Sequence, residues 1–216
     1  MKNYALEMDK VVASLGGRRP RLLLQSCCGP CSTAVLEVLC PHFAVTLLYY
    51  DPNIQPEAEY ALRLENQLRV LRELHPEVAL LPCEYDGAAF TAAARGLEGE
   101  PEGGARCTAC FRLRLGYTAR AAAEGGFEFF CTTLSVSPHK DAERLNAIGA
   151  ELGEKYGVRY LPGDFKKRDG YKRSIELSKE LGLYRQDYCG CLYSKTECTA
   201  RVSTPREADS LNQNGR

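Results

Sequence analysis

The chain has 216 residues, of which 44% are hydrophobic, so it is long enough for one domain whose core needs no disulfide support. Its 28 basic and 28 acidic residues balance, which excludes an argument from net charge for a nucleic-acid partner and leaves only a local basic patch. No apolar run approaches the ~18 residues that cross a membrane, and MKNYALEMDKVVASL lacks the apolar core of a signal peptide. We therefore expect a cytoplasmic protein with no membrane partner.

Strands and helices alternate along the predicted chain. Short apolar runs predict strands at 21–25, 44–50, 78–81, 127–134 and 158–161. Helical periodicity predicts helices beginning near Ser32 or Thr33, then along a face of Leu64, Leu68, Leu71 and Leu74, over 87–97, over 110–124, over 138–156 and over 171–182. This order predicts a single α/β domain over 1–200, with a mainly parallel, doubly wound sheet, C-terminal helices and a cysteine-rich segment. The polar tail, 201–216, is expected to be disordered.

Polar and sulfur-bearing residues follow the predicted strands. Cys27 and Cys28 come after the first strand, Asp51 after the second and Asp86 after the third. Because the carboxyl ends of parallel strands share one edge of the sheet, where ligands bind, we expect a functional site there. Asp86 is a candidate iron ligand or proton donor, or else the N-cap of the helix over 87–97. Asp51 precedes Pro-Asn, is typical of a turn and is assigned no role.

Three tight groups of cysteines stand out. They are Cys27, Cys28 and Cys31; Cys107 and Cys110; and Cys189, Cys191 and Cys198. Cytosolic thiols are mostly kept reduced, so such groups indicate a metal centre or redox chemistry. Four thiolates suffice for zinc or an iron–sulfur cluster, and Cys27, Cys28, Cys107 and Cys110 are the predicted ligands. The adjacent pair favours a multi-iron cluster, because neighbouring side chains diverge.

Two cysteine patterns allow other interpretations. Cys28-Gly-Pro-Cys31 has the thioredoxin spacing at a strand-to-helix junction, which would make the chain a thiol–disulfide oxidoreductase, although it has no Trp and carries the extra Cys27. Cys189-Gly-Cys191 permits either a strained, easily reduced disulfide or two thiols facing one centre. Cys40 and Cys131 lie inside apolar segments and are predicted core residues.

Basic residues gather late in the chain, interleaved with tyrosines. They are Lys166, Lys167, Lys172 and Arg173, with Arg185 nearby. Such a pattern suits phosphate contacts and base stacking, and the alternative is the solvated start of a helix. The chain has no P-loop and no GxGxxG motif, so nucleotide binding has no motif to support it.

Six ordered motifs link these observations. They are LLLQSCCGPCS, YYDPNIQPEAEYALR, RCTACFRLRL, FCTTLSVSPHK, GDFKKRDGYKRS and YRQDYCGCLYS. In their order and spacing, from Arg21 to Ser194, the chain resembles the cobalamin-independent epoxyqueuosine reductases, the QueH family. The resemblance implies a Rossmann-like fold of the PP-loop and HUP type, with SCCGPCS where the PP-loop carries SGGxDS. It also implies a [4Fe–4S] cluster and leaves open an additional mononuclear iron.

The activity implied by the resemblance is the last step of queuosine synthesis, in which the epoxide of epoxyqueuosine at the tRNA wobble position becomes an alkene. Cys27, Cys28, Cys107 and Cys110 would hold the cluster, with Cys31 facing away. Cys189 and Cys191 would act beside it as redox thiols or as ligands of the additional iron. The basic residues would bind the anticodon stem-loop, and an external donor would supply electrons. The remaining alternative is a zinc-stabilised, tRNA-binding enzyme of PP-loop ancestry.

Overall fold

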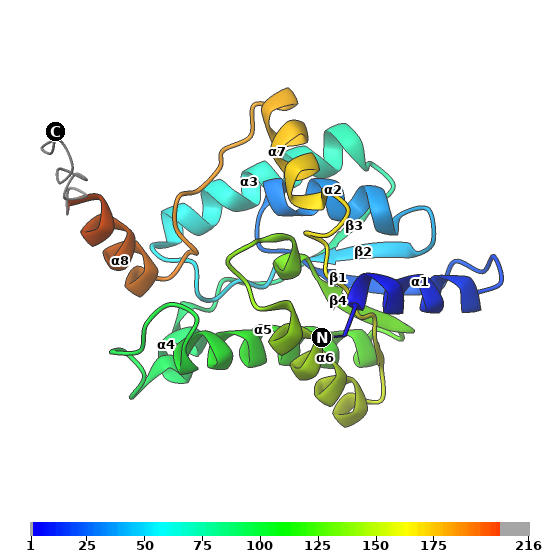
Figure 1. Ribbon diagram of the computed structural model, residues 1–216, viewed down its shortest axis with the longest axis horizontal. Helices are drawn as coiled ribbons and strands as arrows, with labels where there is room; N and C mark the ends of the chain where they lie inside the picture. Colours follow the sequence, from blue (N-terminus) through cyan, green and yellow to red (C-terminus); the bar gives the residue numbers. More distant parts are fainter. Residues whose placement is uncertain (1, 204–216) are drawn as a thin grey trace, which may run out of the picture.

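The computed structural model describes residues 2–203, with the backbone alone for 200–203 (Figure 1). Its centre is a five-stranded sheet in the order β3-β2-β1-β4-β5, and every strand pair in the described residues is parallel. The strands are β1 (Arg21–Gln25), β2 (Ala44–Leu48), β3 (Ala79–Leu81), β4 (Phe129–Thr132) and β5 (Arg159–Tyr160). The α/β fold class is thereby confirmed.

Helices cover both faces of the sheet (Figure 1). They are α1 (Tyr4–Ser14), α2 (Gly29–Leu39), α3 (Glu57–Leu74), α4 (Gly87–Ala94), α5 (Ala105–Glu124), the 3₁₀ helix η1 (Thr133–Val136), α6 (Ala142–Tyr156), α7 (Gly170–Glu180) and α8 (Leu192–Ser203). Leu22 and Leu24 of β1 pack under α2 and α3, whereas Leu23 packs against α5 and α6. This alternation buries both faces of the strand, as a doubly wound sheet requires.

Two helices had no counterpart in the sequence prediction. α1 begins after Asn3, whose Oδ1 accepts a hydrogen bond from the Leu6 N–H at 3.3 Å. α8 follows the last cysteine-rich segment and continues to Ser203, while 204–216 lie outside the described residues. Within the described part of the chain, no helix is both long and apolar enough to cross a membrane.

The start of α2 differs from its predicted position. The helix begins at Gly29 because Cys28 is its N-cap, with Sγ accepting from the Cys31 N–H at 3.4 Å. Ser32 and Thr33, the predicted starting residues, lie inside the helix and donate their hydroxyl groups to the carbonyls of Gly29 and Pro30. Cysteine is not among the usual N-cap residues, so the sequence pattern pointed to the nearest hydroxyl.

The buried face of α3 is also more polar than predicted. Leu68 is 43% exposed, whereas Arg63 and Gln67 are buried. Gln67 accepts from the Ser26 hydroxyl at 2.7 Å and donates to Ser32 Oγ at 2.9 Å. The leucine spacing predicted the wrong buried face, because α3 packs partly against polar segments at the carboxyl edge of the sheet.

Gly29 is a point of close approach between α2 and α3. A Cβ at Gly29 would stand 2.7 Å from the Asn66 carbonyl oxygen, so Gly29→Ala should push the helices apart and lower the unfolding free energy by about 1–3 kcal/mol. Urea denaturation measures the change. The matched control is Gly116→Ala in α5, where the nearest atom is Leu152 Cδ2 at 3.9 Å and a gain of up to about 1 kcal/mol is expected. Equal stability of the two variants would contradict the packing argument.

Candidate metal centre

A cavity of about 260 Å³ opens at the carboxyl edge of the sheet. Its lining includes Cys27, Cys31, Asp51, Arg114, Lys140 and Cys189. These residues come from the ends of β1 and β2, from the first turn of α2, from α5, and from the segments that follow η1 and α7. The residues after β1 and β2 therefore meet at one site, as predicted, whereas Asp86 after β3 does not line it.

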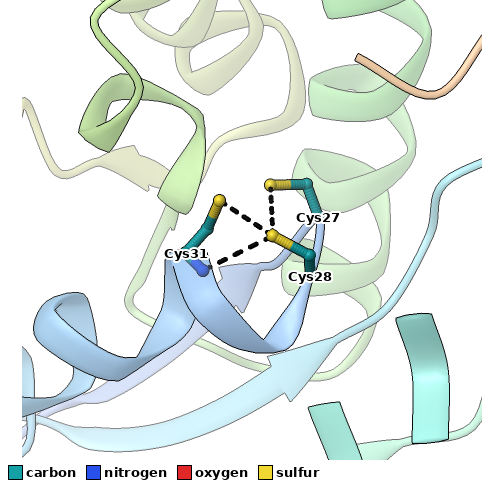
Figure 2. Close-up of side chains that lie close together, drawn as sticks. All are labelled: Cys27, Cys28 and Cys31. Atoms are coloured by element: carbon teal, nitrogen blue, oxygen red, sulfur yellow. Dashed lines mark hydrogen bonds between the residues drawn. The ribbon is translucent and has the colours of Figure 1, made fainter. Parts of the chain in front are cut away.

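Three cysteine sulfurs gather at the start of α2 (Figure 2). The Cys28 sulfur lies 2.8 Å from that of Cys31 and 3.8 Å from that of Cys27. All three sulfur atoms lie within 4.8 Å of one another, an arrangement that could hold a metal ion. The expectation that Cys31 faces away is wrong, because one turn of helix returns its side chain to the face of the N-cap.

The surroundings of Cys28 favour its thiolate. Burial raises its pKa, but hydrogen bonds with Cys27, Cys31 and Gln186 Nε2 outweigh burial, and the pKa lies well below that of an ordinary thiol. The same hydrogen bonding with Cys28 raises the pKa of Cys27 to about 11. The pKa of Cys31 is likewise raised by its hydrogen bonds with Cys27 and Cys28. The trio thus concentrates negative charge on one central sulfur, as a site for a soft cation needs.

The other predicted thiols form a second group. Cys107 and Cys110 lie in the first turns of α5, and the Gly103 N–H donates to Cys107 Sγ at 3.2 Å. Cys110 packs with Cys191 in a small buried cluster. Burial raises the pKa of Cys110 to about 12, with Cys189, Cys191 and Cys107 adding to the increase. The α5 pair therefore lies nearer the C-terminal cysteines than the sequence suggested.

All eleven cysteines fall within the described residues and all are free thiols, so the disulfide considered for Cys189 and Cys191 is not formed. Lys140 Nζ instead donates to Cys189 Sγ at 3.0 Å and to Glu102 Oε1 at 3.1 Å. Burial alone would lower the pKa of Lys140, but the charges of Cys189 and Glu102 outweigh burial and raise it. Lys140 is therefore a buried cation in the cavity wall.

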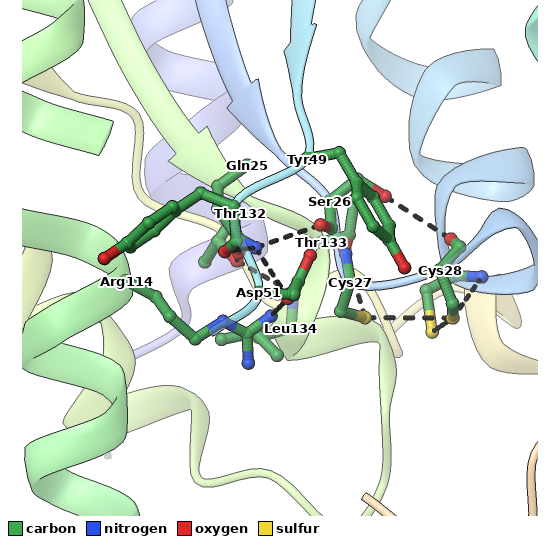
Figure 3. A network of polar contacts seen from close by, with 12 residues as sticks. Gln25, Ser26, Cys27, Cys28, Tyr49, Asp51, Arg114, Thr132, Thr133 and Leu134 are labelled. Carbon is green, nitrogen blue, oxygen red and sulfur yellow. Dashed lines mark hydrogen bonds and ion pairs between the residues drawn. The ribbon is translucent and has the colours of Figure 1, made fainter. Parts of the chain in front are cut away.

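A buried ion pair joins Arg114 to Asp51 near Cys27 (Figure 3), and the charge of Cys110 also acts on Arg114. Arg114 reaches from α5 to Asp51, and both side chains are at most 2% exposed. Gln25 Nε2 also donates to Asp51 Oδ1 at 3.2 Å, whereas Asp51 Oδ2 is buried without a hydrogen-bond partner in the described structure. Burial raises the pKa of Asp51 to about 7 against the lowering by Arg114.

Sequence reasoning missed that these two residues pair. Asp51 was seen at a strand end but interpreted as a turn residue. Arg114 carried one usable signal, its position four residues after Cys110 and seven after Cys107, which places it on the same face of α5. The positive charge of Arg114 lowers the pKa of Cys27 and of Cys110. The pair thus links two groups of thiols that come from distant parts of the sequence.

Asp86 lies away from this cavity. Its Oδ1 accepts from the Ala89 N–H at 3.1 Å, so the interpretation as the N-cap of α4 is confirmed. It is not among the residues lining the cavity. A role for Asp86 in binding iron or donating a proton stays a prediction, without a contact to support it.

The predicted basic residues divide into a set with polar partners and a set that forms no ion pair with any described residue. Lys166 pairs with Asp164, and Arg173 pairs with Glu37. Arg185 donates to the Ser174 carbonyl and the Ser178 hydroxyl, and it lines the cavity. Lys167 and Lys172 are exposed and form no ion pair with any described residue.

The fold and the site together define a class: a parallel α/β protein whose cysteines could hold a metal at the carboxyl edge of the sheet. The family model described as "Epoxyqueuosine reductase QueH" matches residues 22–197. This chain therefore belongs to the epoxyqueuosine reductase QueH family, a family of oxidoreductase enzymes, as its motifs predicted.

Individual relatives agree with the family match, and each is named Epoxyqueuosine reductase QueH. The protein from Staphylococcus epidermidis is 40% identical over 206 residues, covering 90% of this chain and 87% of the relative. That from Streptococcus pyogenes serotype M1 is 41% identical over 202 residues, covering 89% and 79%. That from Acinetobacter baylyi is 37% identical over 209 residues, covering 95% of both chains.

Proposed function

We propose that this chain reduces the epoxide of epoxyqueuosine, at the wobble position of tRNA, to the alkene of queuosine. The conversion consumes two electrons and two protons and releases the epoxide oxygen as water. Family membership supports the substrate, and the three sulfurs within 4.8 Å of one another are the observation that carries the chemistry.

The donor set fits an iron–sulfur cluster, which takes thiolate ligands. Cys27, Cys28, Cys107 and Cys110 are the proposed ligands of a [4Fe–4S] cluster, and the short distance between Cys31 and Cys28 makes Cys31 an alternative to either cysteine of α5. Such a cluster supplies electrons one at a time, so an external donor must reload it.

Cys189 and Cys191 remain candidates for redox thiols or for ligands of an additional mononuclear iron. Support for a centre close to them comes from Asp51, whose Oδ2 is buried and lacks a partner in the described structure. Asp51 lines the cavity, whereas Asp86 does not, so Asp51 is the better-supported carboxylate ligand. A carboxylate beside thiolates suits iron better than it suits copper(I), which prefers sulfur alone.

One side chain of the cavity can hold a proton that the reaction consumes. Lys140 keeps a proton on Nζ, since its pKa is raised beside Cys189 and Glu102. Lys140 lines the cavity, where it can donate that proton to the departing oxygen.

The first experiment is a metal and sulfide analysis of protein purified without oxygen, followed by reaction with tRNA that carries epoxyqueuosine and a chemical reductant. About four sulfides with four or five irons per chain, and queuosine in the nucleoside digest, are expected. One zinc without sulfide and no queuosine would contradict the proposal in favour of a structural metal. Insulin disulfide reduction without any metal would favour the thioredoxin-like alternative at Cys28 and Cys31.

The tRNA interface should depend on the unpaired lysines near α7. We expect Lys167→Glu/Lys172→Glu to weaken tRNA binding and to reduce the slope of log K against log salt by about 1–2, because two phosphate contacts are lost. Binding titrations at several salt concentrations measure both effects. The control, Arg72→Glu/Lys155→Glu, makes the same charge change in the last turns of α3 and α6, at the opposite edge of the sheet. Equal effects of the two double variants would refute a local interface.

A further inference from the structure

A second group of metal-ligating residues lies at the edge of the sheet opposite the cavity. Cys40 is the C-cap of α2, His75 is the C-cap of α3, and Glu77 lies in the turn that leads into β3. Their ligand atoms lie within 4.8 Å of one another. Among the described residues that line the cysteine cavity, none belongs to this group, which we call the Cys40 trio.

The imidazole ring of His75 is largely buried and lies beside Glu77. Its Nδ1 lies 3.2 Å from Glu77 Oε1, and its side chain is 12% exposed. The other ring nitrogen, Nε2, is buried and has no hydrogen-bond partner in the described structure. Because Nδ1 faces the Glu77 carboxylate, Nδ1 is the ring nitrogen that a metal ion held by both side chains would take.

The backbone holds the ligands in position. The N–H groups of Cys40 and His75 close the last turns of α2 and α3, donating to Leu36 and Leu71 at 2.9 and 3.1 Å. Arg19 Nη2 donates to the Cys40 carbonyl at 2.6 Å. Cys40 is a free thiol that is partly buried and packs against the core, at whose border rather than in whose centre it therefore lies. Only Glu77, with 53% of its side chain exposed, retains freedom to move.

We propose that Cys40, His75 and Glu77 form a second metal site, for Zn²⁺ or a similar divalent cation, with water as the fourth ligand. Sulfur, imidazole and carboxylate together are a ligand set that zinc accepts. A tetrahedral zinc ion with bonds of about 2.0–2.3 Å holds its ligand atoms about 3.3–3.8 Å apart. The His75 to Glu77 distance of 3.2 Å is already close to this value, and the exposed Glu77 can adjust the remaining distances.

The site would join the ends of α2 and α3, and α2 also carries part of the cysteine centre. α2 carries Cys28 and Cys31 at its beginning and Cys40 just after its end. A metal on the Cys40 trio would fix the far end of α2 against α3, without touching the cavity. Occupancy should therefore stabilise the fold by mass action, since the unfolded chain does not hold these three ligands together.

The test titrates Co²⁺, a spectroscopic substitute for zinc, into protein purified without oxygen and retaining its iron. We expect one cobalt per chain, with a thiolate-to-cobalt charge-transfer band that Zn²⁺ abolishes, and a higher Tm when zinc is added. Cys40→Ser should lose the band. His75→Asn and Glu77→Gln should weaken binding about 10- to 100-fold, the range typical of a damaged metal site.

Matched controls separate the site from general effects. His42→Asn removes an exposed imidazole two residues from Cys40, and Glu73→Gln removes a carboxylate that is paired with Arg69. Both should bind cobalt as the parent protein does. A full charge-transfer band in Cys40→Ser, or none in the parent protein, would overturn the proposal. If Cys40→Ser does not fold, the surface variant Glu77→Gln decides: unchanged affinity would also overturn it. Iron content, measured in parallel, reports on the cysteine centre separately.

Discussion

Replacing Cys28 by serine is expected to remove the metal from the cysteine centre and leave the fold intact. Cys28 is the central sulfur of its trio, within 2.8 and 3.8 Å of the other two. Its second role, accepting the Cys31 N–H at the start of α2, is one that a serine hydroxyl performs well. Bound iron should therefore fall at least about tenfold and queuosine formation more than about 100-fold, since outer-shell changes alone cost 10- to 100-fold.

Iron and sulfide analysis, with the nucleoside digest, measures this effect, and circular dichroism checks the fold. The control is Cys131→Ala, a buried cysteine of β4 outside the metal-binding groups of the described residues, which should keep its iron. Cys107→Ser and Cys31→Ser then test the proposed division of ligands. A brown, fully loaded Cys107→Ser protein would exclude that cysteine, and a fully loaded Cys28→Ser protein would refute the centre.

Asp51→Asn is expected to destabilise the protein by about 3–5 kcal/mol, because it leaves the Arg114 charge buried without its counter-ion. Both side chains of the pair are at most 2% exposed, so water cannot replace the lost carboxylate. Activity should fall as well, since Asp51 lines the cavity. Urea denaturation of the iron-loaded protein measures stability, and the nucleoside digest measures turnover.

A double-mutant cycle distinguishes this ion pair from a simple packing effect. Arg114→Gln should cost about as much as Asp51→Asn, and the double variant should cost less than the sum. The control pair is Arg112 and Glu151, joined at 2.7 Å with side chains 49% and 57% exposed. Arg112 lies on the same helix as Arg114, and breaking its exposed pair with Glu151 should lower the unfolding free energy by less than about 1 kcal/mol. Additive losses at Asp51 and Arg114 would contradict the coupling.

The sequence predicted the sheet and most helices because the strands are short apolar runs and both faces of the sheet are buried. It failed where polar packing replaced the apolar stripe. On α3, Gln67 is buried because it bonds to Ser26 and Ser32, which no leucine spacing encodes. The start of α2 was misplaced because a sulfur atom caps it.

Only part of the candidate site could be predicted, because topology shows which strand ends meet but not which side chains approach each other. Strand ends converge by topology, so Cys27 and Asp51 could be placed at one edge from sequence alone. Which thiols approach each other depends on helix phase and on long loops. Cys31 returns toward Cys28 through one helical turn, and Cys110 meets Cys191 through a chain separation that no local pattern reveals. The Asp51–Arg114 pair likewise joins two elements that are remote in sequence.

The attachment of the last cysteine segment has a consequence for the order in which the protein matures. Arg63 of α3, 1% exposed, donates to the carbonyls of Tyr188 and Cys189, and the Gln55 N–H donates to the Gly190 carbonyl. The segment around Cys189, which forms part of the cavity wall, is thus held by hydrogen bonds to α3 and to the loop that precedes α3. Because this segment is synthesised after residues 27–31, a nascent chain exposes Cys27, Cys28 and Cys31 before this part of the wall is present. The cavity can therefore close only after this segment has been synthesised.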